Sequence, residues 1–181
     1  MNIPNMLTLA RIALMPVLVL CFEQDPEKSN FYAASIMVFA AITDFIDGYI
    51  ARAWNQKTLV GAVLDPIADK VVILIGMVLL VTRYQSPWIL GLILIMLSRE
   101  FIVSGLRESA ASQPNKQAIP VNQIGKVKTC AQMIAMIALM LFYPVLPEWV
   151  FILGMVALVT ATVFSLISLC QYSIVFVKTL S

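Results

Sequence analysis

Residues 31–53 read FYAASIMVFAAITDFIDGYIARA, and residues 62–83 read AVLDPIADKVVILIGMVLLVTR. Each stretch has roughly the 20 residues that an apolar helix needs to cross a bilayer. Each also contains two aspartates near the segment that joins them, Asp44 and Asp47 in the first and Asp65 and Asp69 in the second. An aspartate at the centre of a membrane helix costs about 2.5–3.5 kcal/mol to insert. Four of them in two successive spans indicate a membrane protein whose acids have a function.

The whole 181-residue chain has the composition of an integral membrane protein. It is 61% hydrophobic and 12% charged, with a mean hydropathy of +0.92, whereas soluble domains are about 45–50% apolar and about 25% charged. The chain contains no basic run of the kind that would suggest nucleic-acid binding. The chain contains no histidine, which excludes triads with a histidine base and histidine-ligated zinc. Three widely spaced cysteines without C-x-x-C spacing are interpreted as packing residues: Cys21, Cys130 and Cys170.

Outward from these two stretches, six apolar runs are separated by polar or proline-containing breaks. The pattern predicts an all-α integral membrane protein, a bundle of six transmembrane helices that forms a single domain over residues 1–181. Arg11 lies inside the first run and no small-residue cleavage site follows, which favours a retained helix over a signal peptide. The predicted spans are 6–22, 31–53, 62–83, 87–106, 124–143 and 149–176.

Basic residues lie mostly on one side of the predicted bundle. Only Lys28 and Arg83 fall on the other side. The positive-inside rule therefore places both termini, and the loops after the second and fourth spans, in the cytoplasm. The bases on this side are Arg11, Arg52, Lys57, Lys70, Arg99, Arg107, Lys116, Lys126, Lys128 and Lys178. Aromatic residues at the opposite boundary are interpreted as an interfacial belt: Tyr32, Tyr84, Trp88, Tyr143 and Trp149.

The four aspartates have the spacing of helix neighbours. Asp44 and Asp47 are three residues apart and Asp65 and Asp69 are four apart, so each pair lies on one helix face. A short connection favours antiparallel neighbouring helices, so we expect the four carboxylates to converge. Hard oxygen ligands suit Mg²⁺ or Mn²⁺, and four aspartates are enough for two ions.

Each of these features also has a structural interpretation. A single aspartate could form an ion pair with Arg52 or Lys70. Gly48 and Gly61 permit close approach to a ligand, although a glycine in a membrane helix more often permits close helix packing. Pro66 either bends the third predicted helix or begins it.

Together these residues resemble the signature of a known family. The pattern Asp44-x-x-Asp47-Gly48-x-x-Ala51-Arg52, followed by Gly61-x-x-x-Asp65-x-x-x-Asp69, is similar to the full signature of the CDP-alcohol phosphotransferases, with every signature position filled. The resemblance includes six spans, a cytoplasmic active site and Pro4-Asn5-x-Leu7-Thr8 ahead of the first helix. Two further stretches, Arg99-Glu100-x-x-x-Ser104-x-Leu106-Arg107 and Gly125-Lys126-x-Lys128-Thr129, are similar to the branch of the family that uses sn-glycerol 3-phosphate.

The resemblance implies that the 1-hydroxyl of sn-glycerol 3-phosphate attacks the lipid-bearing phosphate of CDP-diacylglycerol and expels CMP. It implies that Asp44, Asp47 and Asp65 hold the metals, and that Asp69 both contacts metal and accepts the hydroxyl proton. A carboxylate base is chemically reasonable in a chain without histidine. By the same resemblance, Arg52 and the Gly48 backbone lie against the nucleotide phosphates, and Asn5, Thr8 and Ala51 border the cytidine. The residues expected to bind CDP-diacylglycerol are Asn5, Thr8, Asp47, Gly48, Ala51, Arg52 and Gly61.

The residues also point to a phosphorylated acceptor. Four bases, Arg99, Arg107, Lys126 and Lys128, cluster at the cytoplasmic ends of the fourth and fifth spans. Such a cluster suits a phosphorylated acceptor and would be superfluous for a neutral alcohol or serine. Alternatively, bases next to a membrane enforce topology or contact anionic lipid. Glu100 balances part of this charge.

Other classes of protein share some of these features. Cation channels and transporters also contain intramembrane acids, but here the acids lie near one membrane face only. Membrane prenyltransferases use two aspartate-rich motifs that lie well apart, and a purely structural subunit has no use for four buried acids. Within the family, cardiolipin synthase and phosphatidylinositol phosphate synthase are the nearest alternatives.

The resemblance also implies a location and a partner. We expect a multi-pass protein of the bacterial inner membrane, in contact with the lipid bilayer and without nucleic acid. Family members are commonly homodimers, so a homodimer is expected here. Gly76, Gly91 or Gly154 could allow the close packing of helices.

Overall fold

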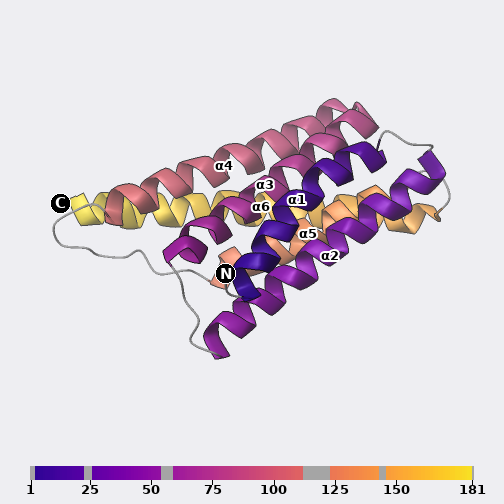
Figure 1. The fold of residues 1–181 in the computed structure, drawn as a ribbon. Coiled ribbons are helices and arrows are strands. Elements are labelled where there is room, and N and C mark those ends of the chain that lie inside the picture. Colours follow the sequence, from indigo (N-terminus) through magenta and orange to yellow (C-terminus); the bar gives the residue numbers. More distant parts are fainter. Residues whose placement is uncertain (1–2, 23–25, 54–58, 112–122, 143–145, 181) are drawn as a thin grey trace.

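The computed structural model describes residues 3–22, 26–53, 59–111, 123–142 and 146–180. Nearly all of these residues lie in six helices (Figure 1). The helices are α1 (Ile3–Phe22), α2 (Pro26–Ala53), α3 (Leu59–Tyr84), α4 (Pro87–Ala111), α5 (Gln123–Phe142) and α6 (Glu148–Leu180). Each corresponds to one predicted span, so the predicted all-α bundle is confirmed.

Several of the helices have the length and composition of a membrane span. Within the described residues, the segments that meet this description are Asn5–Phe22 in α1, Pro87–Ala110 in α4 and Glu148–Val177 in α6. The apolar part of α5 is shorter, Val127–Phe142. Charged side chains interrupt the apolar runs of α2 and α3, the helices that contain the aspartates.

Helix α1 lies between the two aspartate-bearing helices. It packs along both α2 and α3, whereas the residues of α2 and α3 that the structure describes contact each other only sparsely (Figure 1). The expectation that α2 and α3 are direct neighbours is therefore only partly met. Helices α5 and α6 form the most extensive pair, and α4 packs on α6. Successive helices alternate in direction, so both termini lie at the same end of the bundle (Figure 1).

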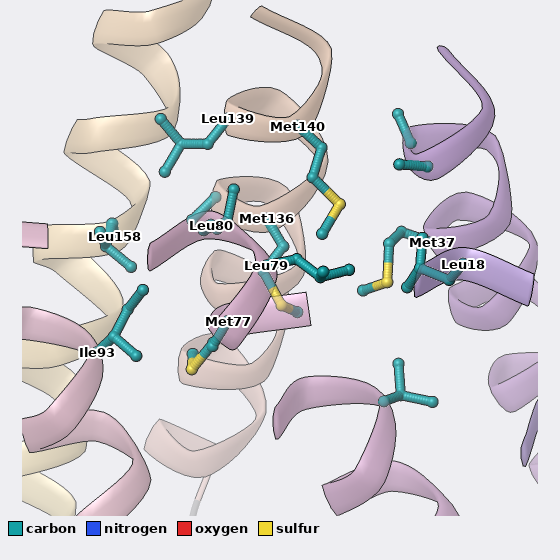
Figure 2. Close-up of a cluster of buried hydrophobic side chains, with 14 of the residues drawn as sticks. Leu18, Met37, Met77, Leu79, Leu80, Ile93, Met136, Leu139, Met140 and Leu158 are labelled. Carbon is teal, nitrogen blue, oxygen red and sulfur yellow. The ribbon is translucent and has the colours of Figure 1, made fainter. Parts of the chain in front are cut away.

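All six helices contribute to one apolar core, and methionines are prominent in it. Figure 2 shows Met37, Met77, Met136 and Met140 among the side chains of this cluster. Methionine is unbranched and polarizable, so it fills irregular gaps between crossing helices.

Two of the glycines permit close packing within the chain itself. A Cβ atom at Gly154 would lie 2.7 Å from Cγ of Leu139, and one at Gly76 would lie 2.9 Å from Sδ of Met136. A Cβ atom at Gly91 would meet nothing within 4 Å. Of the three glycines considered for helix packing, Gly76 and Gly154 therefore serve the core of this chain.

The predicted aromatic belt divides into two kinds of residue. Tyr32, Trp88 and Trp149 are exposed near the beginnings of α2, α4 and α6. Tyr84 instead donates a 2.7 Å hydrogen bond to the carbonyl of Leu139. Its role is therefore to join α3 to α5. Tyr143 lies outside the described residues.

Pro66 lies inside α3, which begins at Leu59. The alternative that Pro66 begins the helix is therefore wrong. Proline has no N–H group, so it removes one bond of the helical ladder directly after Asp65.

Candidate active site

One face of α1 is buried and changes in character along its length. Asn5, Thr8 and Arg11 are buried on this face at intervals of three residues, and Met15 and Leu18 continue it. The polar part thus lies at the N-terminal end of α1, and the apolar part enters the core shown in Figure 2.

Arg11 joins two of the predicted metal ligands. One guanidinium nitrogen, Nη1, donates to Oδ1 of Asp44 at 2.9 Å and to Oδ1 of Asp69 at 2.7 Å. The two carboxylates come from α2 and α3, and both contact the same nitrogen of α1. The acids of the two helices are therefore connected through α1.

Thr8 makes the corresponding contact to the third acid. Its hydroxyl donates a 2.7 Å hydrogen bond to Oδ1 of Asp65. Thr8 and Arg11 are three residues apart on α1, so one helical turn contacts Asp44, Asp65 and Asp69.

These contacts change the expected charge balance of the site. The sequence suggests Arg52 or Lys70 as the ion-pair partner of a single aspartate. In the structure Asp44 and Asp69 both pair with Arg11, and the side chain of Arg52 lies outside the described part. Arg11 is distant in sequence, and its position in the first span gave only a signal about topology. The side chain of Arg11 is 2% exposed, whereas those of Asp44 and Asp69 are 52% and 46% exposed. The guanidinium therefore approaches both acids from the buried side.

A second polar cluster joins α4, α5 and α6. Arg99 donates to Oε1 of Glu100 at 3.3 Å and to the hydroxyl of Ser168. Lys128 forms an ion pair with the same oxygen of Glu100. Arg99, Lys128 and Ser168 are buried. A buried charge is costly unless it is paired, so Glu100 compensates two cations here.

A cavity of about 490 Å³ connects the two clusters. Asp69 and Lys70 line it from α3, and Arg99, Glu100, Ser104 and Arg107 line it from α4. Lys128 and Tyr172 complete its polar wall from α5 and α6. A carboxylate that can accept a proton and several cations thus face one space.

A second cavity, of about 430 Å³, is also lined by Asp69. Both cavities share Asp69, Ile73, Thr129 and Cys130 in their walls. Besides Arg11 and Asp44, the second cavity is lined mainly by apolar side chains: Ala40, Ala41, Val72, Met133 and Ile134. Asp69 therefore stands between a cationic space and an apolar one.

Comparison with known proteins identifies the family. The model of the CDP-alcohol phosphatidyltransferase family matches residues 1–168. The chain belongs to this family. It is therefore an integral membrane enzyme of phospholipid biosynthesis, and the transporter, prenyltransferase and structural alternatives are not supported.

Bacterial enzymes of one description are similar to the chain over nearly its full length. The CDP-diacylglycerol--glycerol-3-phosphate 3-phosphatidyltransferases of Escherichia coli (strain K12) and of Shigella flexneri serotype 5b (strain 8401) are each 45% identical to the chain over 171 residues. The match covers 94% of this chain and 92% of each relative.

The CDP-alcohol phosphatidyltransferase signature falls on the C-terminal part of α2 and the N-terminal part of α3. Asp47, Gly48, Ala51 and Arg52 are helical in α2, but their side chains lie outside the part that the structure describes, as does that of Lys126 in α5. Gly61 is buried in α3. In the described part of the chain, no three acidic side chains are grouped closely enough to hold a metal ion by themselves.

Proposed function

We propose that this chain transfers the phosphatidyl group of CDP-diacylglycerol to sn-glycerol 3-phosphate, which gives phosphatidylglycerophosphate and CMP. The 45% identity to enzymes named for this activity, over nearly the full length of both chains, supports the assignment. The observation that carries it is the cavity in which Asp69 faces Arg99, Arg107 and Lys128.

The cationic cavity fits the acceptor. Arginine binds a phosphate through several donors of its planar guanidinium, and lysine adds a point charge. Arg99, Arg107 and Lys128 line this cavity. Lys126 lies, like Lys128, near the N-terminal end of α5. With the acceptor phosphate on these cations, its hydroxyl end is directed toward Asp69.

The chemical step is a substitution at phosphorus. The 1-hydroxyl oxygen of glycerol 3-phosphate forms a bond to the lipid-bearing phosphorus, and the bond from that phosphorus to the CMP oxygen breaks. CMP leaves with the bonding electron pair. The carboxylate of Asp69 accepts the hydroxyl proton, because Asp69 lines the cavity in which the acceptor is proposed to bind.

The aspartates fit a divalent metal by the chemistry of their donors. Asp44, Asp65 and Asp69 offer hard carboxylate oxygens, and two of them are about half exposed. In the proposed site, Asp47, whose side chain lies outside the part that the structure describes, would complete the set of ligands. Bound Mg²⁺ or Mn²⁺, two ions in the proposed site, would neutralise the charge of the pyrophosphate.

The apolar cavity fits the lipid part of the donor substrate. Its alanine, valine, isoleucine and methionine side chains suit acyl chains, and its acidic rim at Asp44 and Asp69 adjoins the proposed metals. From the resemblance to the family signature, we propose that the CDP part lies near Gly48, Ala51, Arg52 and Gly61, with Asn5 toward the cytidine.

The remaining assignments follow from the relatives and the sequence. We place the chain in the bacterial inner membrane, with both termini and the active site on the cytoplasmic side, as a single catalytic domain. A homodimer is proposed from the resemblance alone.

The test is CMP release by the purified chain. With CDP-diacylglycerol and Mg²⁺ or Mn²⁺, we expect CMP with glycerol 3-phosphate and none with glycerol, serine or inositol phosphate. CMP release with inositol phosphate or serine, but not with glycerol 3-phosphate, contradicts the acceptor. Magnesium flux into proteoliposomes without CMP formation contradicts the proposed activity.

A further inference from the structure

Three aspartates of two different helices are each hydrogen-bonded from the buried side by one turn of α1. Thr8 contacts Asp65, and Arg11 contacts Asp44 and Asp69. In each case the contact uses one carboxylate oxygen, Oδ1. We propose that Thr8 and Arg11 are positioning residues, which fix the aspartates so that their second oxygens face the metal. This inference rests on the metal site of the proposed function.

Burial separates the positioning residues from the ligands. Thr8 and Arg11 are fully or almost fully buried, whereas Asp44 and Asp69 are about half exposed. Arg11, Asp44 and Asp69 all line the second cavity. Thr8 lies in the wall of neither cavity described above. Its hydroxyl therefore acts on Asp65. The expectation that Thr8 borders the cytidine stays a prediction.

Hydrogen bonds to a metal-binding carboxylate restrict its rotation. Outer groups of this kind commonly change metal affinity by about 10- to 100-fold when they are removed. Restricting the rotation of these carboxylates matters here because the described residues of α2 and α3 contact each other only sparsely, whereas α1 packs along both helices and contacts their acids.

The test must distinguish the positioning role of Arg11 from direct competition with the metal. As a cation next to the acids, it could compete with Mg²⁺ or Mn²⁺, and its loss would then raise metal affinity. Arg11→Lys keeps the charge and changes only the geometry. Thr8→Val removes the hydroxyl without changing shape or charge, and Thr8→Ser restores the hydroxyl.

The measurement is Mn²⁺ affinity of the full-length chain in detergent, followed by loss of the free-Mn²⁺ electron paramagnetic resonance signal. We expect about 10-fold weaker binding for Thr8→Val, about 10- to 100-fold weaker binding for Arg11→Lys, and nearly unchanged binding for Thr8→Ser. Two matched controls should bind as the wild type does: Thr162→Val, whose buried hydroxyl bonds within α6, and Arg83→Lys, whose guanidinium contacts Ser29.

Each outcome has a definite meaning. Unchanged affinity in both Thr8→Val and Arg11→Lys, in a wild type that binds Mn²⁺, overturns the positioning role and leaves the proposed activity intact. Tighter binding in Arg11→Lys overturns it, because the geometry of the arginine then opposes metal binding instead of supporting it. Weaker binding in the controls overturns it in favour of a general loss of structure. A wild type that binds no Mn²⁺, and releases no CMP, overturns both this inference and the proposed function.

Discussion

Lys128 of α5 forms an ion pair with Glu100 of α4, and both side chains line the cavity that contains Asp69. The same Glu100 oxygen also accepts a hydrogen bond from Arg99. The carboxylate of Glu100 thus binds the same donors of Arg99 and Lys128 that the acceptor phosphate would need. The site is electrically prepared for an anion before the acceptor arrives.

Glu100→Gln should lower the thermal stability of the empty protein and strengthen acceptor binding. Two buried cations lose their counter-ion, which destabilises by an amount on the order of 1–3 kcal/mol for a partly buried pair. The phosphate then meets less competition, so KM for glycerol 3-phosphate should fall several-fold. Thermal unfolding with and without glycerol 3-phosphate, together with KM, checks this. Glu148→Gln, at the other end of the bundle, is the control, and a higher KM for Glu100→Gln would refute the competition.

Arg99→Lys should raise KM for glycerol 3-phosphate by about 10- to 100-fold, because a lysine keeps the charge but not the planar fork that also reaches Ser168. The value of kcat should change less. CMP release over a range of acceptor concentrations measures both constants. Arg83→Lys is the matched control. A fall in kcat of Arg99→Lys with an unchanged KM would argue against a role of Arg99 in acceptor binding.

Asp69→Asn should reduce kcat by about 10²- to 10⁴-fold, the range of a general base. An asparagine oxygen can still accept the bond from Arg11, so the local structure should persist. Mn²⁺ should remain largely bound, as measured by electron paramagnetic resonance. Near-normal turnover would remove Asp69 from the role of base.

Ala41→Phe should weaken the donor and spare the acceptor, because the larger side chain fills the apolar cavity. KM for CDP-diacylglycerol should rise while KM for glycerol 3-phosphate stays nearly constant. The control is Val163→Phe on an exposed face of α6. Equal changes in both KM values would mean that the cavity does not hold the lipid.

Gly154→Ala should destabilise the bundle by about 1–3 kcal/mol, the cost of overpacking a filled core. Its new Cβ would lie 2.7 Å from Cγ of Leu139, whereas Gly91→Ala meets nothing within 4 Å. Thermal unfolding in detergent should therefore show a lower Tm for the first variant only. An equal Tm for both would show that α5 and α6 can separate without cost.

The sequence predicts the helices well because their length and apolar character follow directly from the thickness of a bilayer. It also brings Asp44, Asp65 and Asp69 to attention, since unpaired acids in such helices are costly. It does not predict which helices touch. Lipid-facing and core-facing sides of a membrane helix are both apolar, so hydrophobic periodicity does not reveal the partner.

The role of Arg11 shows this limit. Its partners are 33 and 58 residues away, and its contact depends on α1 lying between α2 and α3. The sequence alone indicates only that Arg11 is one of the basic residues on the predicted cytoplasmic side. A possible signal was its position inside an apolar run, three residues after Thr8.

The ion pairs of Arg11 also affect how the protein is made. Because synthesis proceeds from the N-terminus, α1 reaches the membrane before α2 and α3, the helices that carry Asp44 and Asp69. An arginine at the centre of a membrane helix costs about 2.5–3.5 kcal/mol, and less toward its end. That cost remains uncompensated until α2 and then α3 arrive. The contacts that prepare the acidic site thus also complete the insertion of the first helix, which ties the biogenesis of α1–α3 to the assembly of the site.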